Sequence, residues 1–189
     1  MTVEKDGVDY GPLETLIGKW IGETGLDIAP NQDCDPCDCA YVDELTFKPV
    51  GDVTNAREQT LISIRYHHVV RRRDNGEVFH DQIGHWLYEP ATGLVMHSIS
   101  LPRGVCLLAG GTVTEKNDQT TFEVEATKDS ETFGIVQSPF MLEKARTDSF
   151  HMKLSVSGDR MKYRQSTMLH IYGKDFDHID TSELKRVGK

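Results

Sequence analysis

Short segments rich in β-branched and aromatic residues follow one another along this chain, and turn residues separate them. Gln59 to Val70 is one such segment; Asp74-Asn75-Gly76 then offers a hairpin turn, and Glu77 to Tyr88 follows. Phe150 to Val156 alternates apolar and polar residues strictly. Strands joined by turns rather than helices predict an up-and-down antiparallel sheet, and closure removes the edges of so long a sheet. The expected fold class is therefore all-β, a closed antiparallel barrel.

Two short helices are also predicted. Pro12 to Gly18 places its apolar residues on one face and ends at a glycine. Pro139 to Arg146 follows Ser138, which can cap the first turn. The sequence contains no internal repeat, low-complexity tract or linker, so we expect residues 1–189 to form one domain.

The charge balance narrows the choice of partners. A formal net charge of −9 argues against nucleic acid, which binds clustered Lys and Arg. The one basic cluster, Arg71 to Arg73, precedes the Asp74-Asn75-Gly76 turn and is interpreted as a solvated hairpin end. No apolar run approaches the roughly 20 residues of a membrane-spanning helix, and the first residues do not resemble a secretory signal. We therefore expect a cytoplasmic protein without a membrane partner.

Three of the four cysteines crowd into the segment NQDCDPCDC, at Cys34, Cys37 and Cys39. A cytoplasmic location argues against stable disulfides. Three thiolates at this spacing could ligate zinc, but no second pair of ligands follows at the spacing of a zinc finger. The favoured interpretation is a mobile loop at the barrel rim with free thiols, and the zinc site is the alternative.

Several motifs resemble known barrel families. Gly18-Lys19-Trp20-Ile21-Gly22 resembles the opening of lipocalin and fatty-acid-binding barrels, where the indole closes one barrel end. The segment Val78 to Trp86, the Ser100 to Gly104 turn and Gly110-Gly111-Thr112-Val113 resemble the nitrobindin family in order and spacing. The chain is thus identified as a member of the nitrobindin-like haem-binding barrels.

This resemblance implies about ten strands and a bound haem b that reacts with nitrogen oxides, with peroxynitrite isomerisation to nitrate as the activity. It implies His178 as the axial iron ligand, and His80 beside the haem with its neighbour Phe79. His170 is the alternative ligand if the C-terminal end is aligned differently. The sequence departs from the family pattern at Glu23-Thr24, which separate two glycines of the opening, and in the polar residues that follow His178.

The histidines are also interpreted by position. His67 and His68 are adjacent on a strand, so only one of them can face the interior. His85 and His97 lie in apolar strands and are expected to be hydrogen-bonded core residues, whereas His151 should face outward. His178 is either a ligand oriented by Asp177 or Asp180, or an exposed loop residue.

Three functions follow from these observations. The first is a haem protein of the nitrobindin type, whose activity would belong to the cofactor because no hydrolase, transferase or Rossmann motif is present. The second is a non-catalytic carrier of a fatty acid or other apolar ligand, anchored by Arg57, Arg65 or Arg103. The third is a structural domain with no polar group facing inward. A small molecule is the expected partner, and a homodimer is left open.

Overall fold

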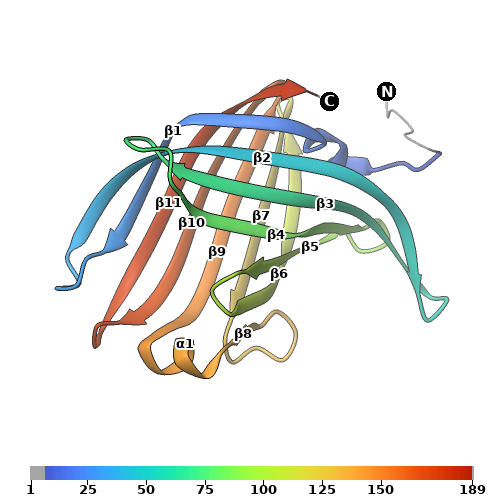
Figure 1. Ribbon diagram of the computed structural model, residues 1–189. Coiled ribbons are helices and arrows are strands. Elements are labelled where there is room, and N and C mark those ends of the chain that lie inside the picture. The colour runs from blue at the N-terminus through green and yellow to red at the C-terminus, as the bar shows by residue number, and fades with distance from the viewer. Residues whose placement is uncertain (1–6, 189) are drawn as a thin grey trace.

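The computed structural model describes residues 7–188, the Cys37 side chain excepted. It contains eleven strands in one antiparallel sheet, a 3-10 helix, η1 (Gly11–Thr15), and one α-helix, α1 (Pro139–Lys144) (Figure 1). The strands are β1 (Gly18–Pro30), β2 (Pro36–Asn55), β3 (Gln59–Arg72), β4 (Val78–Glu89), β5 (Leu94–Leu101), β6 (Val105–Lys116), β7 (Gln119–Thr127), β8 (Ile135–Gln137), β9 (Ala145–Ser157), β10 (Arg160–Ile171) and β11 (Lys174–Gly188).

Ten of these strands close into a barrel, as the sequence predicts. The pairing of β5 with β6 and of β1 with β11 completes the ring, so the first and last strands lie side by side (Figure 1). The short strand β8 pairs only with the start of β6 and adds an eleventh member outside the ring. No helix in residues 7–188 is both long and apolar enough to cross a membrane.

Alternation along the strands fills the interior. On β9 the predicted set Phe150, Met152, Leu154 and Val156 is buried, and His151 between them points outward toward Glu123. Burial of one face of every strand is the main source of stability in such a barrel, at about 25 cal/mol per Å² of apolar surface.

One end of the barrel is closed by the segment before β1. Trp20 is fully buried there, and its Nε1 donates a hydrogen bond to the Leu16 carbonyl oxygen at 2.8 Å. The Arg186 guanidinium lies over the indole at 4.0 Å and donates to the carbonyl oxygens of Thr15 and Ile17. The predicted role of Trp20 at the barrel end is confirmed.

Both predicted helices exist with corrections. The first is a 3-10 helix at Gly11–Thr15 rather than a helix over Pro12 to Gly18, because β1 begins at Gly18. The second, α1, ends at Lys144, two residues before the predicted end, because β9 begins at Ala145. Ser138 caps it as predicted, since its Oγ accepts a hydrogen bond from the Met141 amide at 3.4 Å.

The cysteine-rich segment is less of a loop than predicted. Only Asn31–Asp35 form the turn, where the Asn31 side chain accepts hydrogen bonds from two backbone amides, and β2 already begins at Pro36. Cys39 therefore lies in β2, paired with Asp27 of β1, and its sulfur accepts a hydrogen bond from Arg72 at 3.2 Å. Cys34, Cys39 and Cys106 carry free thiols; the Cys37 thiol lies outside the described side chains.

Candidate functional site

A cavity of about 320 Å³ occupies the end of the barrel opposite Trp20. Its walls combine apolar side chains with a cluster of ionisable ones. The apolar part comes from β3, β4, β5, β10 and others, as in Val70, Phe79, Leu101, Leu169 and Ile171; the polar part includes Asp27, His68, His80, Arg103, Tyr163, Gln165, His178 and Asp180. Its volume is at the lower end of the range for small-molecule sites, about 300–1,000 Å³.

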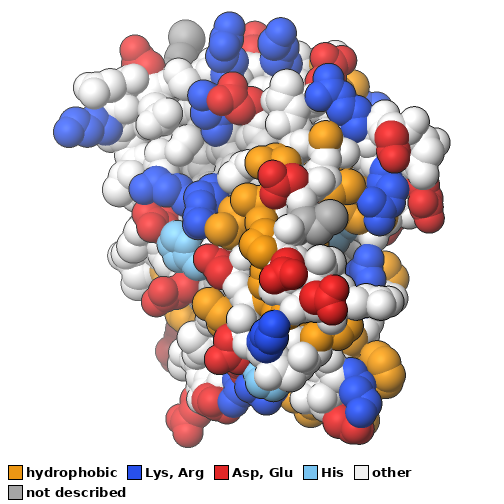
Figure 2. Space-filling model, turned by 90° about the vertical axis from the view of Figure 1, so that its left-hand side faces the viewer, with side chains coloured by type: hydrophobic (Ala, Val, Ile, Leu, Met, Phe, Trp, Pro, Cys, Tyr) orange, Lys and Arg blue, Asp and Glu red, His pale blue; other side chains and the backbone are white. Residues whose placement is uncertain are grey.

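The hairpins that end beside this cavity face the left of Figure 1, and Figure 2 views the molecule from that side. Hydrophobic side chains gather down the middle of this face, between acidic and basic ones (Figure 2).

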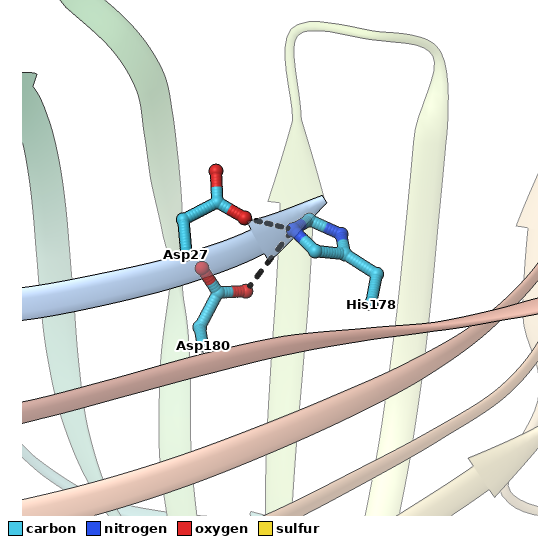
Figure 3. A group of neighbouring side chains, drawn as sticks. All are labelled: Asp27, His178 and Asp180. Carbon is cyan, nitrogen blue, oxygen red and sulfur yellow. Dashed lines mark hydrogen bonds and ion pairs between the residues drawn. The ribbon is translucent and has the colours of Figure 1, made fainter. Parts of the chain in front are cut away.

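His178 lies in the wall of the cavity, on β11. Its Nε2 is 2.7 Å from Asp27 Oδ1 and 3.7 Å from Asp180 Oδ2 (Figure 3). Burial alone would lower the pKa of His178, but the hydrogen bond with Asp27 and the charge of Asp180 outweigh it, and the pKa is raised. Of the two predicted orienting acids, Asp180 is beside the ring, whereas Asp177 instead accepts a hydrogen bond from Ser166.

Strand register explains why two carboxylates meet this imidazole. Asp27 of β1 is the direct cross-strand partner of Asp180 of β11, and His178 precedes Asp180 by two residues on the same face. Glu23 and Thr24 form an irregularity in β1, so that Trp20 and Gly22 face inward before it and Gly25 and Asp27 after it. Glu23-Thr24, where the sequence departs from the family pattern, therefore shifts the alternation of β1 so that Asp27 faces the cavity.

Phe79 and His80 both line the cavity although they are adjacent in sequence. In the pairing of β3 with β4, Val70 is opposite His80 and Arg71 opposite Val78, which leaves Phe79 as an extra residue. Such a bulge lets two neighbouring side chains point to one side. His80 Nε2 is 3.1 Å from Gln82 Oε1, and burial, together with nearby His68, lowers the pKa of His80 to about 4. His80 is therefore neutral near pH 7.

The alternative ligand His170 is elsewhere. It is not among the side chains that line the cavity, and its Nδ1 is 2.7 Å from the exposed Asp175 near the end of the β10–β11 hairpin. Among the three arginines proposed as carboxylate anchors, Arg103 lines the cavity, whereas Arg57 and Arg65 are exposed.

Two of the other histidines differ from expectation. His85 is exposed rather than part of the core, because Gln82 and Trp86 of β4 face inward and the alternation turns Ile83 and His85 outward. His97 is buried as predicted and stacks on Trp86 at 4.1 Å, but neither ring nitrogen has a hydrogen-bond partner among the described residues. Of the adjacent pair, His68 faces inward and His67 outward, as their adjacency requires.

A buried polar network under the cavity was not predicted. The Asp43 carboxylate, 3% exposed, accepts hydrogen bonds from Tyr163 Oη at 2.9 Å and Ser182 Oγ at 2.8 Å, and lies 3.2 Å from His68 Nε2. Tyr41 Oη is 2.8 Å from Tyr163 Oη. The sequence signal for its burial was its spacing. Asp43 lies at every second position together with Tyr41, Leu45 and Phe47, so it shares their inward face of the strand.

Two glycines of the opening motif make room for this network. A Cβ on Gly22 would overlap the carboxylate of Asp43, and a Cβ on Gly25 would overlap the ring of Tyr41. These glycines are thus required by close packing in the interior rather than by turns.

Comparison with known proteins identifies the family of this chain. Residues 9–186 match the family model described as "THAP4-like, heme-binding beta-barrel domain". The chain belongs to this family. A solved structure of similar fold, described as the crystal structure of Rv2717c from M. tuberculosis, is 20% identical, with a TM-score of 0.71 over 93% of this chain and 96% of the other. The resemblance to nitrobindin-like barrels is thereby confirmed at the level of family and fold. Membership of this haem-binding barrel family indicates that the barrel binds a small ligand.

Proposed function

We propose that this barrel binds haem b in the 320 Å³ cavity, with His178 as the axial ligand and His80 and Phe79 beside it. The supporting observation is that His178 and the adjacent pair Phe79 and His80, almost 100 positions apart in the sequence, line one cavity together with apolar side chains. The chemistry of the donor set fits: His178 offers an imidazole, and Arg103 offers a guanidinium that can pair with a propionate. An inward cluster of this kind also contradicts the alternative of a purely structural domain.

Different residues of the chain would exclude water from the cavity and orient the imidazole of His178. Apolar residues such as Val70, Leu101 and Leu169 exclude water from the cavity. Asp27 and Asp180 hold the imidazole of His178 in place before the ligand arrives, and His178 must give up its 2.7 Å contact with Asp27 if Nε2 is to bind a metal. Bound haem would supply an iron centre that reacts with nitrogen oxides, for which peroxynitrite isomerisation to nitrate is the proposed activity.

Hemin titration tests the site. Wild type should give a saturable Soret shift, and His178→Ala should weaken binding and move the Soret band because the iron loses its protein ligand. His170→Ala is the matched control, since it removes a histidine that also contacts an aspartate but lies outside the cavity, and its titration should follow wild type. Loss in His170→Ala with an unchanged band in His178→Ala would reassign the ligand.

The activity is tested separately. Hemin-loaded wild type should accelerate peroxynitrite decay and raise the yield of nitrate relative to nitrite, and the protein without hemin should do neither. Equal decay with and without hemin would remove the catalytic part of the proposal while leaving haem binding intact.

A carrier of an apolar carboxylic acid is the second candidate, because Arg103 lines the cavity and could bind the carboxylate. The absence of any saturable Soret shift in wild type would favour it. Direct titration with a fluorescent fatty acid, and its loss in Arg103→Gln, would then support the carrier.

A further inference from the structure

We propose that Asp27, His178 and Asp180 form a site for a divalent transition-metal ion bound directly to the protein, without a porphyrin. This inference goes beyond haem binding and does not depend on it. It predicts that a free metal ion and haem compete for the same nitrogen, His178 Nε2.

The first argument is geometric. One ligand atom from each of these three residues lies within 4.8 Å of the other two, and the side chains point toward one another (Figure 3). Zinc bonds of about 2.0–2.2 Å in a tetrahedral site place neighbouring ligand atoms about 3.4 Å apart. The 2.7 Å and 3.7 Å separations from Nε2 to the two carboxylates lie on either side of this value, so small side-chain rotations would complete three ligand positions.

The second argument is charge. Asp27 and Asp180 face each other directly across the β1–β11 pair, and Asp27 is only 6% exposed. Like charges placed directly opposite destabilise a sheet, and a buried carboxylate needs a partner of opposite charge. Throughout residues 7–188, no lysine or arginine forms an ion pair with either carboxylate. The Arg103 guanidinium, which lines the same cavity, donates instead to the Phe79 carbonyl oxygen at 2.7 Å.

Among residues 7–188, His178 is the one basic side chain within ion-pair distance of both carboxylates. A divalent ion would balance both, and it would leave the imidazole neutral and free to act as a ligand.

The donor set and its surroundings define the class of ion. One imidazole and two carboxylates suit Zn²⁺, Fe²⁺, Co²⁺ or Mn²⁺ better than Ca²⁺ or Mg²⁺, which prefer oxygen ligands alone. Three protein ligands leave at least one position open toward the cavity for water or a small ligand. Gln165 on β10 donates to Asp180 Oδ2 at 3.4 Å and would help to orient that carboxylate, as second-layer groups do in metal sites.

Cobalt titration of the full chain, without an affinity tag and without haem, tests the site. Wild type should bind one equivalent of Co²⁺ and show visible d–d absorption, and Zn²⁺ should displace it. Asp27→Asn and Asp180→Asn should each weaken binding by at least about tenfold, because an amide is a poor substitute for a carboxylate ligand. Asp175→Asn is the matched control, since it alters the other His–Asp pair of the same hairpin, His170–Asp175, at the surface.

Folding is checked in the same samples. Zn²⁺ should raise the melting temperature of wild type and of Asp175→Asn, but not of Asp180→Asn, and all three should share one circular dichroism spectrum. Absence of a stoichiometric cobalt complex in wild type would overturn the proposal, as would cobalt binding of equal strength in wild type and in both site variants.

Hemin separates this inference from the proposed function. Zn²⁺ added first should reduce the apparent affinity of wild type for hemin, and Asp180→Asn should bind hemin equally with and without Zn²⁺. A Soret shift without cobalt binding contradicts only the metal site, and cobalt binding without a Soret shift contradicts only the haem proposal.

Discussion

His97 shows how one buried side chain can control the acid stability of the barrel. It is 1% exposed, stacks on Trp86, and has no hydrogen-bond partner for either nitrogen among the described residues. Burial, and to a lesser degree the charge of His68, lowers its pKa to about 3. The unfolded chain binds a proton near pH 6.5 while the folded protein does not, so stability is lost as the pH falls.

We predict that His97→Phe makes the loss of stability in acid smaller, while partly buried His80, whose pKa is also lowered, keeps its own share. Between pH 7 and pH 5 the histidine should cost wild type about 2 kcal/mol of unfolding free energy, at 1.36 kcal/mol per pKa unit, and the variant should not pay this cost. The apolar ring keeps the stack on Trp86 and also removes two unpaired polar atoms. Urea unfolding at the two pH values measures the difference.

Ile99→Val is the control, since it trims a buried neighbour on the same strand face. It should lower stability by about 0.5–1.5 kcal/mol at both pH values and leave the slope unchanged. A His97→Phe slope equal to that of wild type would mean that the ring is protonated or hydrated in the folded protein.

At this scale the sequence predicts some orientations well and others poorly. Adjacency alone decides that His67 and His68 face opposite sides. The inward position of Asp27 could not be predicted, because it depends on the irregularity at Glu23-Thr24, which shifts the alternation of β1 by one residue. The two carboxylates of the candidate site become neighbours only when β1 and β11 pair, and no local pattern fixes that register.

At the scale of elements, η1 and the start of β1 form the closed end of the barrel. Trp20→Ala should destabilise the protein by about 3–5 kcal/mol, because it removes a fully buried indole, its hydrogen bond to Leu16 and the stacking surface for Arg186. Urea unfolding followed by circular dichroism gives this value. Val53→Ala, at a side chain that is 44% exposed, should change it by less than about 0.5 kcal/mol. A cost below about 1 kcal/mol for Trp20→Ala would show that the indole does not seal this end.

Strands and their turns were the most predictable elements, since alternation and the turn residues both act locally. Element ends were less so. The acidic segment around Cys37 and Cys39 has the composition of a loop, yet β1 continues to Pro30, and pairing with it extends β2 back to Pro36. The bulge at Phe79 also arises from cross-strand pairing, and it explains why the inward set of β4 did not follow a simple alternation.

At the scale of the whole molecule, ligand binding should be visible as stability. Hemin at 100 times its dissociation constant should add about 2.7 kcal/mol to the unfolding free energy, which corresponds to about 5–10 °C for a chain of this size. Thermal unfolding at several hemin concentrations should show this rise in wild type and in His170→Ala, but much less of it in His178→Ala. A saturating Soret shift with a constant melting temperature would indicate that hemin binds unfolded chain or the outer surface equally well.

The pairing of β1 with β11 has a consequence for how the protein is made. Asp27 lies close to the beginning of the chain and His178 and Asp180 close to its end, and the strand pair that joins them is also the one that closes the ring. During synthesis, residues 18–30 can pair with β2 early, but they cannot pair with β11 until residues 174–188 have been made. Contacts of such long sequence separation form late and slowly. A chain that lacks β11 therefore has no complete pocket, so ligand loading must follow synthesis of that strand.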